Sequence, residues 1–148
     1  MTRQAMTPAA RRAGVGVVTK RDIGPMVITL YGIPRTKKNS GQIAIGRDGK
    51  PHVFPSKAWR AWVKTVQSNH GKKSLFMLSD RPYNCEAVFY RDANRGDANG
   101  YYQGLADLLE KWGLISNDKW IVSWDRSRLE VDRALPRVVF TLTPTGTK

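Results

Sequence analysis

The sequence lacks several features that would assign it to a common structural class. Only one of its 148 residues is a cysteine, Cys85, so the chain has no intrachain disulfide framework. No apolar run approaches the roughly 18 residues of a membrane helix, and the N-terminus has no continuous apolar secretory segment. Cys85 lies in a strand-like run, where we expect a buried packing residue rather than a nucleophile. We therefore expect a cytoplasmic protein.

Acidic residues are also scarce. The chain has 12 Asp and Glu against 25 Lys and Arg, which gives a formal net charge of +13 and a pI near 10.3. A charge so far from zero favours a polyanionic partner, and nucleic acid is the most common one. A membrane surface is the less favoured partner, because no long basic amphipathic helix is evident. Charge alone does not separate DNA from RNA.

Residues 1–25 differ in composition from the rest of the chain. They are rich in Ala, Gly, Thr and Arg, and their five basic residues against Asp22 give +4, so the remainder carries +9. One interpretation is a flexible arm that neutralises phosphates. The other is a solvated tail, or a leader upstream of a start at Met26. We prefer the second, because chain termini are commonly disordered.

Residues 26–148 predict one domain with alternating strands and helices. Asp48-Gly49 marks a hairpin turn, Ser56 a helix start, and Gly71 and Gly113 two helix ends. The expected strands are 26–32, the hairpin 42–54, 83–91, 119–124 and 137–143, and the expected helices are 56–70 and 101–112. Residues 125–136 are expected as a polar, arginine-rich connection. This order predicts an α+β fold with one mixed sheet and two main helices.

Each predicted helix has an apolar stripe at helical spacing. Packing in the core explains the Trp59, Trp62, Val63 and Val66 stripe better than stacking on bases does. The second stripe consists of Tyr101, Leu105, Leu108, Leu109 and Trp112. Both stripes are therefore predicted to face the sheet.

The loop after the first strand contains several cations and small polar residues. Arg35, Lys37, Lys38 and Asn39 could hold phosphates through charge and amide donors. An ordinary solvated turn explains the same composition equally well.

Two aspartates flank the second predicted helix. Asp97 follows a loop that contains Arg95 and precedes the helix, and Asp118 precedes the next strand. A helix–turn–strand return can bring both carboxylates to one rim, where hard oxygen ligands could hold Mg²⁺ against a phosphate. The alternative is that Asp97 only caps the helix and Asp118 only closes a turn.

The stretch Arg91–Val122 resembles the core of the RusA family of Holliday-junction resolvases, common in phages and prophages. That family shows a basic loop, an Asp-x-Asp-Asn pattern, a lysine one turn later, a Leu-rich helix, and Asp-Asp before a Val-Val strand. Here Asp97 and Asp118 fall on the first and the later aspartate, and the helix, Gly113 and Ile121-Val122 also match. The similarity extends over roughly 26–142, with its specific part in this stretch.

The resemblance implies an α+β homodimer that needs Mg²⁺, or Mn²⁺, and cuts two opposed strands of a four-way DNA junction during recombination and repair. In a phage-encoded protein this work takes place in the bacterial host cytoplasm. Asp97 and Asp118 would be the catalytic metal ligands, with Asn99 assisting. The DNA contacts would come from Arg35, Lys37, Lys38, Asn39, Arg95 and Lys119.

Three positions depart from the family pattern. Asn99 stands where the family has its second aspartate, Gln103 where it has the catalytic lysine, and Asn117 where it has the first of the Asp-Asp pair. An amide oxygen can bind Mg²⁺ without contributing charge, whereas glutamine cannot replace a cation. Arg95 or Lys119 could supply a positive charge in space, and the sequence does not decide between them. Two alternatives stay open: a junction-binding relative with a weakened metal site, and a basic RNA or nucleic-acid binding protein with structural carboxylates.

Overall fold

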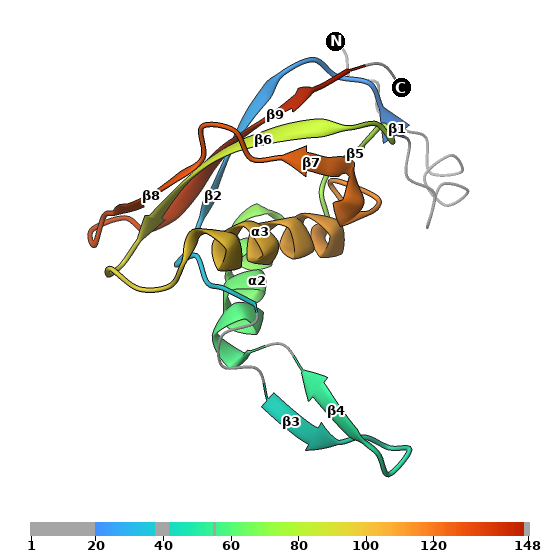
Figure 1. Ribbon diagram of the computed structural model, residues 1–148, viewed down its shortest axis with the longest axis vertical. Coiled ribbons are helices and arrows are strands. Elements are labelled where there is room, and N and C mark those ends of the chain that lie inside the picture. The colour runs from blue at the N-terminus through green and yellow to red at the C-terminus, as the bar shows by residue number, and fades with distance from the viewer. Residues whose placement is uncertain (1–19, 38–41, 55, 147–148) are drawn as a thin grey trace.

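A five-stranded mixed sheet forms the framework of the computed structural model, which describes residues 20–37, 42–54 and 56–146 (Figure 1). Its strands are β2 (Met26–Tyr31), β9 (Arg137–Pro144), β6 (Tyr83–Arg91), β7 (Ile121–Ser123) and β8 (Arg128–Val131). Strand β9 lies between β2 and β6 and is antiparallel to both. Strands β7 and β8 pair in parallel with opposite ends of β6.

Alternation along the central strand decides which face of the sheet is buried. Tyr83, Cys85, Ala87, Phe89 and Arg91 are buried, and the residues between them are half-buried. This period of two is what a strand with one covered face requires. Cys85 is fully buried and burial raises the pKa of its thiol, which confirms a packing role rather than a nucleophilic one.

Helices α2 (Lys57–His70) and α3 (Ala98–Trp112) pack on one side of the sheet, as Figure 1 shows. Both predicted apolar stripes are buried, so the tryptophans of α2 are core residues. Ser56 caps α2 by accepting a hydrogen bond from the Trp59 N–H, and Gly113 ends α3 with φ of 91°. The α+β fold with a mixed sheet and two helices is therefore confirmed for the described residues. None of the described helices combines the length and apolar character that a membrane span needs.

A separate hairpin projects from the body of the molecule. Among the described strands, β3 (Gln42–Ile45) and β4 (Pro51–Phe54) pair only with each other, and Ala44 lies opposite His52. Figure 1 shows the hairpin beyond the start of α2, on the side away from the five-stranded sheet. The turn has φ of 78° at Gly49, as the Asp-Gly signal predicts.

The observed boundaries of α3 and β7 differ from the predicted ones. Helix α3 begins at Ala98 rather than Tyr101, because the Asp97 side chain caps it ahead of its first apolar residue. Strand β7 is shorter than the predicted 119–124, because Asp118–Trp120 form a 3₁₀ turn whose Lys119 N–H is bound by Asn117 Oδ1 at 2.9 Å. The 3₁₀ turn therefore displaces the strand start to Ile121.

Three further strands were not predicted. Strand β8 lies inside 125–136, where the open edge of β6 supplies the pairing that the polar side chains of β8 do not indicate. Strands β1 (Lys20–Arg21) and β5 (Met77–Leu78) pair in parallel. The Lys20–Asp80 ion pair at 2.7 Å supports β1, so ordered structure begins before the expected boundary at Met26. The prediction for residues 1–19 lies outside the described residues.

Candidate functional site

The first turn of α3 is held by contacts to the loop that precedes it. Asp97 Oδ1 accepts a hydrogen bond from the Gly100 N–H at 2.8 Å, so one carboxylate oxygen serves as the helix cap. Arg91, only 7% exposed, donates to the Arg95 carbonyl at 3.0 Å and to the Glu130 carbonyl at 3.1 Å. These contacts fix residues 92–96 between β6 and α3.

Tyr101 adds a second support to the same loop. Its hydroxyl donates to the Arg95 carbonyl at 2.9 Å, and a Cβ on Gly96 would lie 2.7 Å from its ring. Burial raises the pKa of Tyr101 against the opposing effect of nearby arginines, which keeps the phenol protonated as a donor at neutral pH. Gly96, with φ of 78°, is thus required both by its conformation and by this close approach.

Two of the predicted site residues meet at one cavity, together with the position at which the family pattern has its lysine. Asn99, Gln103 and Asp118 border a cavity of about 270 Å³ beside α3. The other residues around it are Tyr102, Ala106, Ile121 and Trp124. Among the described residues, no hydrogen bond joins Asp97 to Asp118. Asp97 lies six residues before Gln103, which is about 9 Å along a helix axis.

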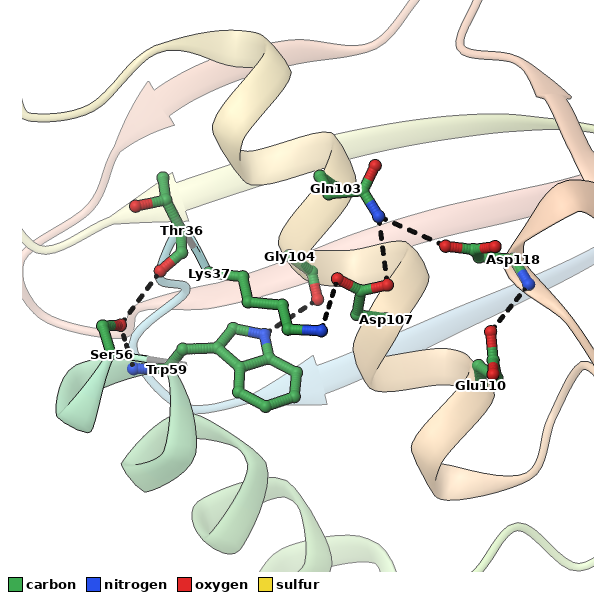
Figure 2. A network of polar contacts seen from close by, with 9 residues as sticks. All are labelled: Thr36, Lys37, Ser56, Trp59, Gln103, Gly104, Asp107, Glu110 and Asp118. Atoms are coloured by element: carbon green, nitrogen blue, oxygen red, sulfur yellow. Dashed lines mark hydrogen bonds and ion pairs between the residues drawn. The ribbon is translucent and has the colours of Figure 1, made fainter. Parts of the chain in front are cut away.

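The Gln103 side chain connects two carboxylates. Its Nε2 donates to Asp107 Oδ1 and to Asp118 Oδ2 (Figure 2). Since these distances are 3.0 and 3.2 Å, the two accepting oxygens lie at most 6.2 Å apart. Glu110 fixes the backbone of the same turn, because its Oε1 accepts from the Asp118 N–H at 2.9 Å. Asp118 therefore meets the middle of α3 rather than its beginning.

Lys37 reaches this network from the loop after β2. Its ammonium lies 3.0 Å from Asp107 Oδ2 and 5.2 Å from the centroid of the Trp59 ring. Asp107 thus receives the Gln103 amide on one oxygen and the Lys37 ammonium on the other, and its side chain is only 15% exposed. Lys37 was predicted as a DNA contact, and the structure places it beside a carboxylate instead of free in solvent.

Close packing at Gly104 brings the Lys37 loop to α3. A Cβ on Gly104 would lie 2.6 Å from the Arg35 carbonyl oxygen, so the absence of a side chain permits the crossing. Trp59 Nε1 donates to the Gly104 carbonyl at 3.0 Å, and Ser56 Oγ donates to the Thr36 carbonyl at 3.3 Å (Figure 2). The loop is therefore clamped between the two helices.

The predicted arginines gather on another side of α3. Arg95 lies 3.3 Å from Asp92, Arg35 lies 4.0 Å from the same carboxylate, and both border a cavity of about 200 Å³. Lys119 lies over the Trp120 ring, with its ammonium 4.9 Å from the ring centroid. Lys38 and Asn39 lie outside the described residues.

The donor set offers oxygens but few charges. No group of three or more His, Cys, Asp and Glu residues converges on a possible metal position in the described part of the chain. Two carboxylates with neighbouring amides remain, which suits a hard cation that keeps several waters. Asp107 is not among the residues that the sequence predicts for the site. Its spacing of four from Gln103 could have linked the two residues, because such pairs face each other on a helix.

No family model matches this chain, and no curated protein matches it.

Proposed function

We propose that this protein is a divalent-metal-dependent endodeoxyribonuclease that cuts branched DNA, with four-way junctions as its preferred substrate. The observation that carries the proposal is the convergence of Asp107 and Asp118 on one amide beside a cavity. Two adjacent carboxylates are unusual in a chain with a net charge of +13, where phosphates are the expected partner. The resemblance of Arg91–Val122 to the RusA family gives the substrate class.

The types of donor present suit a Mg²⁺ or Mn²⁺ ion. Asp107 Oδ1 and Asp118 Oδ2 would hold it, with the amide oxygens of Asn99 and Gln103 as neutral ligands after rotation of the Gln103 amide. The second carboxylate oxygen of Asp97, which does not cap the helix, stays a candidate ligand at the N-terminus of α3. A bound Mg²⁺ supplies an acidified water and neutralises charge on the phosphate.

The chain's own residues would position the strand and balance charge. Lys37 places a cation at the carboxylates, where positive charge favours approach of a phosphate. Arg35 and Arg95 offer planar donors that match phosphate oxygens. A two-fold homodimer would present one such site to each of two opposed strands, which is what symmetric cutting of a junction requires.

A second candidate is a junction-binding protein without cleavage activity. It is favoured by the saturation of the carboxylates, because the Lys37 ammonium and the Gln103 amide already satisfy Asp107. A metal ion would have to displace the Gln103 amide from both carboxylates. Only two negatively charged ligands, Asp107 and Asp118, would then bind the ion. Under this alternative the network would be a structural connection between the Lys37 loop, α3 and the turn at Asp118.

Cleavage of a synthetic four-way junction distinguishes the candidates. The intact chain, with Mg²⁺ or Mn²⁺, is expected to make paired symmetric nicks that Asp118→Asn and Asp107→Asn abolish. Asp97→Asn tests, in the same assay, the metal ligand that the sequence predicts beside Asp118. Glu86→Gln, on the opposite face of the sheet, is the matched control and should cut normally.

Binding of junction, duplex and RNA at fixed salt completes the test. Tight junction binding without nicks would reject the nuclease and favour the second candidate. Equal affinity for all three ligands would reject both, because contacts to phosphates alone do not discriminate between them. It would leave a general nucleic-acid binding protein with structural carboxylates.

A further inference from the structure

A second cavity lies at the point where α2, α3 and the Arg35 loop meet. It has a volume of about 200 Å³ and is bordered by Arg35, Thr36, Ala58, Arg95 and Tyr101, with Ser56 and Gly96 completing the wall. It is distinct from the carboxylate cavity, which is bordered by Tyr102. Since Tyr101 and Tyr102 are consecutive on α3, the two cavities open on neighbouring sides of the same helix.

Thr36 brings a hydroxyl to the cavity wall, and no hydrogen bond joins this hydroxyl to another group among the described residues. The residue is 9% exposed, its carbonyl accepts from Ser56 Oγ, and its methyl group approaches Gly100. Figure 2 shows the hydroxyl directed away from the network around Gln103. The hydroxyl is therefore free to donate a hydrogen bond to an oxygen of a ligand in the cavity.

The charges around the cavity favour an anion. Arg35 and Arg95 come from different loops and share a single acid, Asp92, with Arg35 at the limiting distance of 4.0 Å. The first turn of α2 adds a backbone donor. Ser56 Oγ accepts the Trp59 N–H, whereas the Ala58 N–H has no acceptor within the helix because it lies in the first turn. Two guanidinium groups, one hydroxyl and a backbone N–H form a donor set suited to a phosphate.

We propose that this cavity is a subsite for a single phosphate, which takes one backbone phosphate of a bound DNA strand. This inference rests on the proposed function for the identity of the strand, while the phosphate chemistry stands on the cavity itself. A strand held here would pass along the first turns of α3 toward the Asn99, Gln103 and Asp118 cavity. The subsite would then fix the register of the strand at the carboxylates.

Inorganic phosphate tests the cavity without nucleic acid. Titration into the ¹⁵N-labelled full chain, followed by NMR, is expected to shift the amide resonances of Ala58 and Gly96. Arg35→Gln and Thr36→Val should each weaken the response, and Thr36→Val should do so about five-fold, as expected for one neutral hydrogen bond. Arg133→Gln, an exposed cation outside the cavity, should leave the titration unchanged. Equal titrations in the wild type and both cavity variants would refute the subsite.

The salt dependence of DNA binding separates this inference from the nuclease proposal. Arg35→Gln should reduce the slope of log K against log salt by about 0.9, the value for one phosphate contact on duplex DNA. An unchanged slope would contradict the subsite even if the protein cuts junctions. A reduced slope in a protein that cuts nothing would support the subsite and reject the nuclease.

Discussion

Replacing Gly104 by alanine tests how tightly the Arg35–Lys37 loop is packed on α3. Helix propensity alone predicts a gain of about 1 kcal/mol for this change. The new Cβ would lie 2.6 Å from the Arg35 carbonyl oxygen, a backbone atom that cannot rotate away. Overpacking of this kind costs about 1–3 kcal/mol, and shifting the helix also endangers the Trp59 bond to the Gly104 carbonyl, worth about 1 kcal/mol.

The net expectation for Gly104→Ala is a loss of about 2 kcal/mol, because the steric and hydrogen-bond costs exceed the gain in propensity. For a domain of this size that loss lowers the melting temperature by about 4–8 °C. Thermal and urea unfolding measure it, with Gly24→Ala as the control, because a Cβ on Gly24 meets nothing within 4 Å. A Gly104→Ala protein as stable as the wild type would refute the tight crossing.

Two further predictions concern the hairpin and His70. Replacing 42–54 by a short Gly-Ser linker should leave the unfolding free energy nearly unchanged but weaken DNA binding, since the hairpin pairs only with itself and exposes Arg47 and Lys50. Unchanged DNA affinity, or loss of folding measured by circular dichroism, would contradict this. His70 Nε2 accepts the Tyr31 N–H at 3.0 Å, and burial lowers its pKa. Its contribution to stability is therefore full above about pH 6.5 and lost as pH falls through the lower folded-state pKa. In urea unfolding, His70→Gln should remove this part of the pH dependence, and an identical dependence in both proteins would exclude His70 as its source.

The elements with strong periodicity were predictable from the sequence. Strand β6 follows the alternation from Tyr83 to Arg91, and both helices bury the stripes that their spacing indicates. Strand β8 was missed because its pairing depends on the open edge of β6, which no local pattern reveals. The shortened β7 has a similar cause, since the Asn117 side chain stabilises a turn where apolar residues indicated a strand.

The candidate site was only partly predictable, because some of its contacts join residues that lie far apart in the sequence. The sequence grouped Asp97, Asn99 and Asp118 as metal ligands and named Gln103 as a departure from the family pattern. Asn99, Gln103 and Asp118 border one cavity. Asp107 and Lys37 were not connected, because their ion pair joins residues seventy positions apart through a loop crossing. Asp97 was predicted to share a metal with Asp118, and that prediction stays open. The structure adds only that one oxygen of Asp97 caps α3.

The segment from Arg35 to Lys37 connects the two candidate sites physically. Arg35 and Thr36 border the proposed phosphate cavity, while Lys37 reaches Asp107 in the carboxylate network. Both contacts depend on the same crossing at Gly104, so a shift of this loop must change the two sites together. A phosphate that binds Arg35 and Thr36 and shifts their loop would also move the Lys37 ammonium, which is the ion-pair partner of Asp107. We therefore expect phosphate binding in the cavity to be coupled to loss of the Lys37–Asp107 ion pair.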